Sequence, residues 1–139
     1  MKLSVLILAK NEESMIGKCL EHINFADEII VLDQNSNDST SKIAEKYTSK
    51  VLTSKIEEFD ANRNLLKSEA KSEWLLYIDA DERIDNNLAS EIKQAIIDKK
   101  YAAYYFPRKN FILGKWLKNG GWWPDYVPKL FQKSALIGW

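Results

Sequence analysis

The segment Trp74-Leu75-Leu76-Tyr77-Ile78-Asp79-Ala80-Asp81-Glu82 changes abruptly from apolar to acidic residues. A short apolar run of this kind is typical of a strand that is covered on both faces, as in a parallel sheet. Two aspartates that flank one small residue follow directly after the predicted strand. We therefore expect Asp79 and Asp81 to emerge together at the edge of a sheet.

Other apolar segments of the chain alternate with segments of helical period. Strands are predicted at Leu3–Leu8, Glu28–Asp33 and Val51–Leu52. Helices are predicted between them, with inner faces formed by Met15, Ile16, Cys19, Leu20 and Ile23, by Ile43, Ala44 and Tyr47, and by Leu65 and Leu66 of residues 60–69. Strands that alternate with helices indicate crossover units, and hence an α/β fold with a mainly parallel sheet. Ligands of such sheets bind at the carboxyl ends of the strands.

The pattern changes near residue 100. A last helix is predicted at Asn87–Lys99, with Asp85 as its cap and an inner face of Leu88, Ile92, Ala95 and Ile96. From Tyr101 the chain becomes aromatic and strand-like. A length of 139 residues with 45% hydrophobic content suits one core. We predict a single domain over residues 1–139, with a soft internal boundary near residue 100.

Composition excludes several classes of protein. Lysine plus arginine and aspartate plus glutamate number 20 each, so no global charge attracts nucleic acid, and we expect no nucleic-acid partner. The longest apolar run falls far below the roughly 20 residues of a membrane span, and Lys10 and Asn11 interrupt any signal peptide. We expect a cytoplasmic protein. The lone Cys19, on an apolar face, predicts a buried thiol rather than a disulfide or a metal cluster.

Nucleotide folds built on a glycine cradle are also excluded. Neither a Gly-x-x-x-x-Gly-Lys loop nor a Gly-x-Gly-x-x-Gly turn occurs. The single histidine, His22, lies on the polar side of the first helix, which gives little support to a Ser-His-Asp hydrolase. Nucleotide binding must therefore rest on acids, a metal and Arg63.

Asp79 and Asp81 are candidates for a metal site. Hard carboxylate oxygens suit Mg²⁺ or Mn²⁺, which usually keep waters and complete their coordination with phosphate oxygens. Such a metal neutralises charge when a diphosphate departs. The alternative is structural, with Asp79 capping the following turn and Asp81 and Glu82 as solvated acids of a loop.

Further polar residues surround the predicted strand ends. Asp33 can recognise the hydrogen-bond donors of a ribose or a base, or else it caps the turn at residues 34–40. Arg63 can reach a phosphate with two parallel hydrogen bonds, or else it forms a surface salt bridge. Asn11 and Glu13, just past the first strand, are expected to line the same cleft. Lys10 adds positive charge there.

Trp122 and Trp123 follow a glycine pair, which invites a carbohydrate interpretation. Indole rings stack on the apolar faces of sugars, and glycine allows close approach to the backbone. Since many such residues simply fill a core, we expect one tryptophan to face an acceptor and the other to pack. Asp125 can take a proton from an acceptor hydroxyl, or it is an exposed turn acid after Pro124.

Together these segments resemble glycosyltransferase family 2. The matching segments are Leu3–Glu12, the strand end and polar turn Asp33-Gln34-Asn35-Ser36-Asn37-Asp38-Ser39-Thr40, Asn62-Arg63-Asn64, and Trp74–Asp81. The resemblance implies a Rossmann-like GT-A fold, a three-layer α/β/α sandwich, and inverting transfer of a sugar, from UDP-hexose or a related donor. It further implies that residues 1–100 form the nucleotide-sugar-binding half and residues 101–139 the start of the acceptor half.

The resemblance also assigns roles to individual residues. Asp81 is the implied metal ligand, Asp79 the nucleoside-side partner, and Asp125 the candidate catalytic base. The nucleotide-sugar site would include Leu8, Ala9, Asn11, Glu13, Asp33, Gln34, Arg63, Asp79 and Ala80. Trp122 and Trp123 would bind the acceptor.

Within the family, Asp79-Ala80-Asp81-Glu82 with Gly120–Tyr126 and Leu130-Phe131 is most similar to bacterial lipopolysaccharide core glucosyltransferases of the WaaE and LgtF type. This likeness implies a glycan or lipid-linked acceptor and peripheral contact with the inner membrane face. Two departures stand out. Gln34 replaces the usual Asp or Ser of this motif, and Asn35 replaces the usual Gly. These changes put the contact with the nucleobase in doubt. Relatives also continue past Trp139, so we expect C-terminal truncation, and the catalytic base can lie in the missing part.

Two alternatives remain from the sequence. One is a fragment that binds a sugar nucleotide without transferring the sugar. The other is a phosphatase of the haloacid dehalogenase type, which also places Asp-x-Asp after an apolar strand, but after the first strand rather than the fourth.

Overall fold

The computed structural model describes all residues from Met1 to Trp139, arranged around one six-stranded sheet. The strand order is β3-β2-β1-β4-β8-β5, with bounds of Leu3–Ala9 for β1, Glu28–Asp33 for β2, Val51–Thr53 for β3, Trp74–Asp79 for β4, Ala103–Arg108 for β5 and Asp125–Gln132 for β8. Strands β3, β2, β1 and β4 are parallel, and β8 is antiparallel to both neighbours. The predicted mainly parallel sheet is confirmed.

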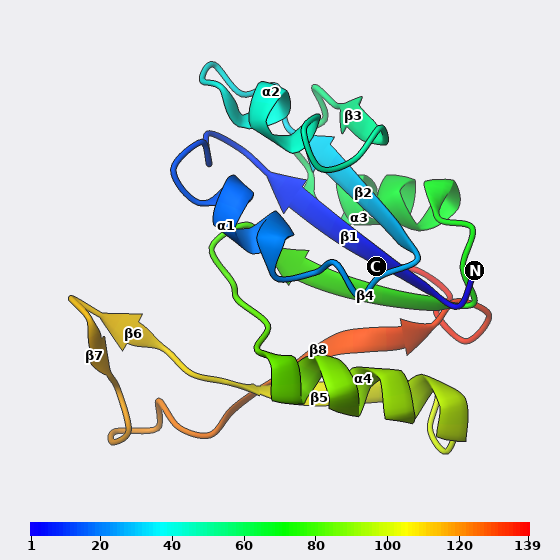
Figure 1. Ribbon diagram of the computed structural model, residues 1–139, viewed down its shortest axis with the longest axis vertical. Helices are drawn as coiled ribbons and strands as arrows, with labels where there is room; N and C mark the ends of the chain where they lie inside the picture. The colour runs from blue at the N-terminus through cyan, green and yellow to red at the C-terminus, as the bar shows by residue number, and fades with distance from the viewer.

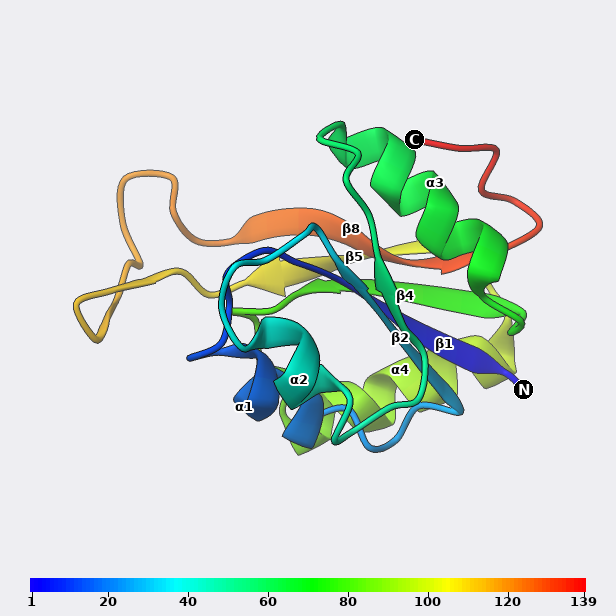
Figure 2. The same ribbon diagram turned by 90° about the horizontal axis from the view of Figure 1, so that it is seen from above.

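Helices cover both faces of the sheet, which gives three layers (Figures 1 and 2). Helix α3 (Phe59–Glu69) and the C-terminal segment lie on one face, while α1 (Ile16–Glu21), α2 (Thr40–Ala44) and α4 (Asn86–Asp98) lie on the other, as Figure 2 shows. Each face has its own apolar core. The larger core joins Val5, Ile7 and Trp74 to α1 and α4, and the smaller joins Leu6 and Tyr77 to α3. The predicted α/β/α sandwich is therefore confirmed.

The buried strands explain the continuous apolar runs of the sequence. Alternate residues of β1 point into opposite cores, so both sets of side chains are removed from water. Fully burying each large aliphatic side chain contributes about 1.5–3 kcal/mol. At the start of β1, the Asp27 carboxylate accepts hydrogen bonds from the backbone N–H groups of Lys2 and Leu3.

Local helix signals were predicted well, with two errors. Asp85 caps α4 as expected, because its carboxylate accepts the Leu88 N–H at 2.8 Å. Met15 and Tyr47 were wrongly placed on inner faces, since their exposed fractions are 37% and 39%. Met15 precedes the first turn of α1, and Tyr47 lies after α2 has ended, so neither follows the helical period of its neighbours.

The aromatic part after residue 100 continues the same sheet. Strands β5 and β8 form its far edge, and β6 (Phe111–Ile112) pairs with β7 (Lys115–Trp116) in a separate hairpin that projects beyond the sheet (Figure 1). No helix in the protein combines the length and the apolar character that a membrane span requires.

The carboxyl ends of β1, β2, β3 and β4 meet at one edge, as parallel pairing requires. Ala9, Asp33, Thr53 and Asp79 are the last residues of these strands. Strand β8 enters the sheet from the same side, because it runs antiparallel to β4. The polar residues predicted at strand ends, including Asn11, Asp33 and Asp79, therefore lie along one edge of the sheet.

Candidate active site

The turn Asp79-Ala80-Asp81-Glu82, called the acidic turn below, follows β4. Its ends are joined by a hydrogen bond from the Glu82 N–H to the Asp79 carbonyl, at 2.9 Å. Ala80 is buried, at 2% exposed, whereas Asp81 is exposed. The two aspartates thus leave the strand in different surroundings: only Asp79 has a charged partner. Asp81 presents a free carboxylate to solvent.

Lys129 of β8 pairs with this turn from the neighbouring strand. Its ammonium lies 3.1 Å from Asp79 Oδ2 and 2.7 Å from Glu82 Oε2. The Lys129 side chain is only 7% exposed. Glu82 Oε2 also accepts the Asp79 N–H at 2.9 Å, so one oxygen closes the turn and holds the lysine. The alternative in which Glu82 is a solvated acid of a loop is therefore wrong.

Sequence reasoning missed Lys129. A signal was present, because Lys129 is the only charged residue in the apolar strand segment 126–131. A lysine is almost never buried without a partner, so its position called for a nearby acid. The identity of that acid depended on which strand lies beside β8, and the sequence pattern did not reveal this neighbour.

Arg63 lies on the α3 face of the sheet between aromatic rings. Its guanidinium carbon is 4.2 Å from the Phe59 ring centroid, 4.2 Å from that of Trp139 and 5.5 Å from that of Tyr77. It forms no salt bridge, so the alternative of a surface ion pair is wrong. Burial lowers the pKa of Arg63, although the Asp79 charge opposes this shift. The side chain remains a cation held near the acidic turn.

The loops after β1 and β2 are tied together by side chains. Asn11 accepts the Asn37 N–H at 2.9 Å, and its backbone adopts a positive φ of 54°, which asparagine tolerates better than most residues. Glu13 accepts the Ser39 N–H at 3.0 Å, and Asp38 in turn accepts the Glu13 N–H at 3.1 Å. Asn11 and Glu13 therefore position the loops at the edge.

Asp33 is buried beneath the second of these loops. At 4% exposed, its carboxylate accepts hydrogen bonds from the Ser36 N–H at 3.2 Å and from the hydroxyls of Ser36 and Ser41. This is the geometry of the turn-capping role considered from the sequence. The same bonds fix the path of Gln34 and Asn35, which follow directly.

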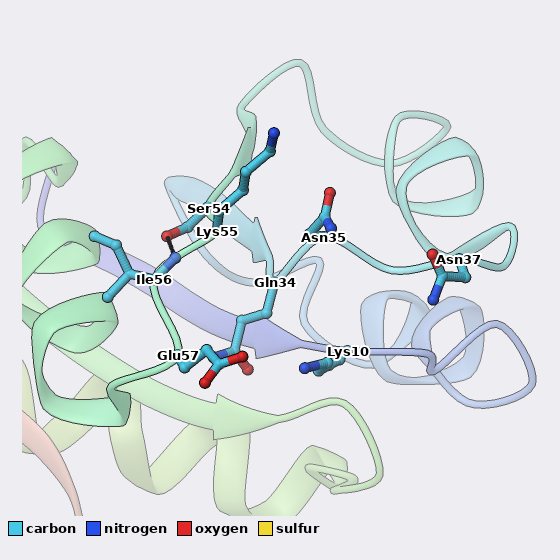
Figure 3. Close-up of a pocket in the computed structure, with 8 residues that line it drawn as sticks. All are labelled: Lys10, Gln34, Asn35, Asn37, Ser54, Lys55, Ile56 and Glu57. Atoms are coloured by element: carbon cyan, nitrogen blue, oxygen red, sulfur yellow. Dashed lines mark hydrogen bonds between the residues drawn. The ribbon is translucent and has the colours of Figure 1, made fainter.

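A cavity of about 230 Å³ opens beside this loop. It is lined by Lys10, Gln34, Asn35, Asn37, Ser54, Lys55, Ile56 and Glu57. Figure 3 shows the Gln34 side chain extending toward Glu57, while Lys55 and Asn35 point away from it. The Gln34 N–H donates to the Ala9 carbonyl at 2.8 Å, which anchors the cavity wall to β1. Gln34 thus presents an amide, with both a donor and an acceptor, to the cavity.

The remaining predicted nucleotide-site residues are apolar. Ala9 and Ala80 are buried at the ends of β1 and β4, and Leu8 is half-buried. Leu8 packs against the smaller core.

Several acidic side chains lie near Asp81 and make the electrostatic potential there negative. Burial raises the pKa of Glu12, and the charges of Asp81 and Asp38 raise it further. Arg83 does not neutralise these acids directly, because its guanidinium donates to the carbonyls of Ala80, Glu82 and Met15. A solvent-exposed carboxylate in this field attracts cations. No cluster of three histidine, cysteine, aspartate or glutamate side chains encloses a metal ion here.

Asp125 lies apart from the acidic turn. It begins β8, four residues before Lys129, which corresponds to roughly 13 Å of extended strand. One carboxylate oxygen accepts from Arg108 Nη2 at 2.8 Å and Asn110 Nδ2 at 3.0 Å. These hydrogen bonds, from Asn110 and then Arg108, hold the pKa of Asp125 below its ordinary value. The carboxylate is therefore a weaker base than a free aspartate.

The two adjacent tryptophans differ in their surroundings. Trp123 packs edge-on against Trp116, with ring centroids 5.1 Å apart at an interplanar angle of 83°. Trp122 is 49% exposed. The ring of Trp122 is accordingly the one available to a ligand.

The chain is similar to known glycosyltransferases. Residues 4–136 match the family model described as Glycosyl transferase family 2. An uncharacterized glycosyltransferase of Rickettsia bellii is 34% identical over 107 residues, which cover 74% of this chain and 36% of that protein. The lipopolysaccharide core biosynthesis glycosyltransferase LpsC of Rhizobium meliloti is 24% identical over 118 residues, covering 81% of this chain and 44% of LpsC. The chain thus spans less than half the length of these relatives.

Solved structures share the fold. Residues 1–349 of TarS from Staphylococcus aureus, in complex with UDP-GlcNAc, align with a TM-score of 0.72 and 20% identity, covering 96% of this chain and 46% of that one. Glucosyl-3-phosphoglycerate synthase from Mycobacterium tuberculosis, in complex with Mn²⁺ and UDP, aligns with a TM-score of 0.51 and 21% identity, covering 59% of this chain and 35% of that one. From the family match over nearly its whole length, the chain belongs to glycosyl transferase family 2.

Proposed function

We propose that this chain forms the donor-binding part of an enzyme that transfers a hexose from UDP, with inversion, to a glycan or a lipid-linked saccharide. The observation that carries the proposal is the arrangement at the carboxyl edge. A cavity lined by polar residues at the ends of β1, β2 and β3 lies on the same edge as the free Asp81 carboxylate after β4. Nucleotides bind at this edge of open α/β sheets.

The nucleoside is assigned to the cavity beside Gln34. An amide that both donates and accepts can pair with the imide edge of uracil, which also has both kinds of group. Asp33 acts beneath it by fixing the loop through Ser36 and Ser41. The TarS structure with UDP-GlcNAc supports a uridine nucleotide as the donor.

Asp81 is assigned to a divalent metal, Mg²⁺ or Mn²⁺. The residues fit such an ion, because Asp81 offers an unpaired carboxylate and no further protein ligands are needed when waters and diphosphate oxygens complete the shell. A bound ion would neutralise charge on the departing diphosphate. The related synthase solved with Mn²⁺ and UDP supports this assignment.

The chain's own residues would support a direct displacement at the anomeric carbon. Asp79, which pairs with Lys129, is assigned to the nucleoside. Arg63, whose pKa is affected by the Asp79 charge, is assigned to the departing diphosphate. The acceptor hydroxyl must lose its proton to a carboxylate. Asp125 stays the candidate base, with Trp122 as the stacking surface for the acceptor. The hydrogen bonds from Asn110 and Arg108 that lower the pKa of Asp125 make it a weaker base than a free aspartate.

Calorimetric titration of UDP in the presence of Mn²⁺ tests the donor site. We expect the wild type to bind UDP and Asp81→Asn to bind it at least about tenfold more weakly, because the metal loses its protein ligand. Asp98→Asn is the matched control, since Asp98 lies at the end of α4 and accepts a hydrogen bond only from Gln94. Equal UDP affinity of Asp81→Asn and the wild type contradicts the proposal.

The acceptor is proposed from the likeness to LpsC, which supports a saccharide of the lipopolysaccharide core. Peripheral contact with the inner membrane face belongs to this part of the proposal. The rival possibility, binding without transfer, is separated by a radioactive-donor assay on this chain and on a longer one. Since the family is established, the haloacid dehalogenase-type phosphatase is no longer an alternative.

A further inference from the structure

We propose that Lys129 is a positioning residue that keeps Asp79 from the metal, so that the ion binds tightly only together with the nucleoside diphosphate. This inference rests on the proposed donor site and deepens it. Lys129 supplies a fixed positive charge beside the acidic turn. Of the three acids in that turn, it leaves Asp81 alone free to coordinate.

The contacts of Lys129 make this charge a permanent part of the turn. Its ammonium lies 2.7 Å from Glu82 and 3.1 Å from Asp79, and only 7% of its side chain is exposed. A buried ammonium without partners is strongly destabilising, so the lysine cannot leave these carboxylates at low cost. Glu82 is further tied to the Asp79 N–H. The carboxylates of Asp79 and Glu82 are therefore both engaged in contacts within the protein.

Asp79 would otherwise be a ligand. It is separated from Asp81 by one residue, its side chain is 40% exposed, and nothing except Lys129 neutralises it at contact distance. Two carboxylates of one turn would bind Mn²⁺ more tightly than one. The lysine therefore opposes metal binding in two ways, by occupying Asp79 Oδ2 and by repelling the ion.

Coupling between metal and donor follows from this arrangement. With a single carboxylate, the protein alone would provide too few ligands for a tightly bound ion, and diphosphate oxygens would be needed to complete its shell. Because binding energies are reciprocal, UDP must tighten Mn²⁺ binding by the same factor as Mn²⁺ tightens UDP binding. Loss of the diphosphate would therefore weaken the hold of Asp81 on the ion by the same factor.

Binding of Mn²⁺ alone, followed by the electron paramagnetic resonance signal of the free ion, tests the role of Lys129. Lys129→Met should bind Mn²⁺ about tenfold more tightly than the wild type, because a repulsive charge is lost and Asp79 becomes available. It should also reduce the factor by which UDP tightens Mn²⁺ binding. Lys129→Arg retains the charge and should stay within about twofold of the wild type.

Lys50→Met is the matched control. Lys50 also forms an ion pair with a glutamate, Glu28, at 3.0 Å with side chains 26% and 10% exposed, but outside the acidic turn. A merely structural role for Lys129 predicts weakened or unchanged Mn²⁺ binding in both methionine variants. Tighter binding in Lys129→Met alone separates positioning from stability. If that variant fails to fold, Lys129→Gln, whose amide still donates to Glu82, carries the same prediction.

The wild type provides a measurement that needs no variant. We expect UDP to tighten Mn²⁺ binding at least about tenfold. Tight Mn²⁺ binding without UDP, or unchanged Mn²⁺ affinity in a folded neutral variant of Lys129, overturns the inference while leaving the donor site intact. Absence of UDP binding by the wild type, with or without Mn²⁺, overturns the proposed function instead.

Discussion

Replacing Arg63 by methionine removes a cation from between two aromatic rings while keeping an unbranched side chain. The guanidinium carbon lies 4.2 Å from the centroids of both Phe59 and Trp139. One cation–π contact contributes about 0.5–1 kcal/mol when exposed and about 2 kcal/mol when desolvated. The two half-buried contacts of Arg63, with Phe59 and with Trp139, should therefore contribute about 2 kcal/mol together. For a domain of this size, that loss lowers Tm by about 8 °C.

Thermal unfolding followed by circular dichroism, on Arg63→Met, Phe59→Leu and the double variant, measures this contribution. We expect a coupling free energy of about 1 kcal/mol between Arg63 and Phe59. Arg63→Lys should be intermediate, because an ammonium keeps the charge but loses the planar stacking.

Lys100→Met is the control for the stack. The Lys100 ammonium lies 5.2 Å from the centroid of the exposed Tyr101 ring, so its replacement should cost less than about 0.5 kcal/mol. A coupling energy near zero between Arg63 and Phe59 refutes the assignment of stabilisation to the stack. Titration of UDP with the same variants separately measures whether the guanidinium contributes to donor binding.

Three further predictions concern the scaffold. Hydrogen bonds from the Leu3 and Lys2 N–H groups lower the pKa of Asp27, so its stabilisation is present above about pH 4 and is lost as the pH falls through the lower native pKa. Asp27→Asn should reduce this acid dependence of the free energy of unfolding, measured by urea titration between pH 2 and 6; an unchanged slope contradicts it. Burial raises the pKa of Cys19 to about 12, so Ellman's reagent should react with it at pH 8 only after denaturation, and rapid reaction of the native protein would show that the thiol is accessible. Asp85→Ala should lower the free energy of unfolding by about 1 kcal/mol through loss of the Leu88 N–H cap, whereas Asp98→Ala, at the other end of the same helix, should not.

Much of the fold was predictable because its signals are local. A strand such as Glu28–Asp33, with its apolar centre, can be interpreted from consecutive residues, and the cap at Asp85 lies three residues from the N–H it satisfies. The errors at Met15 and Tyr47 also have a local cause. Both residues match the helical period of their neighbours in the sequence but lie outside the helices, Met15 before α1 begins and Tyr47 after α2 ends. Helix ends are the part of a helix that a sequence pattern defines least well.

The candidate site was predictable only in part. The position of Asp79 and Asp81 at the end of a strand followed from the sequence, as did the gathering of Asp33 and Asn11 at the same edge, because parallel strands bring their carboxyl ends together. The contacts of these side chains did not follow. Asp33 lies under its own turn, and the assignment of the binding and metal roles stays a prediction that the proposed titrations test.

The amino-acid sequence alone determined the alternation of strands and helices and the acidic turn after β4, because both depend on neighbouring residues and their period. Only the tertiary structure decided which charges the turn meets. Lys129 is separated from Asp79 by 50 residues, and Arg63 meets Trp139 across the α3 face. Such pairs depend on strand order and on which face a helix covers. The triplet Asp79-Ala80-Asp81 therefore has one paired acid and one free acid, a difference that its own residues do not encode.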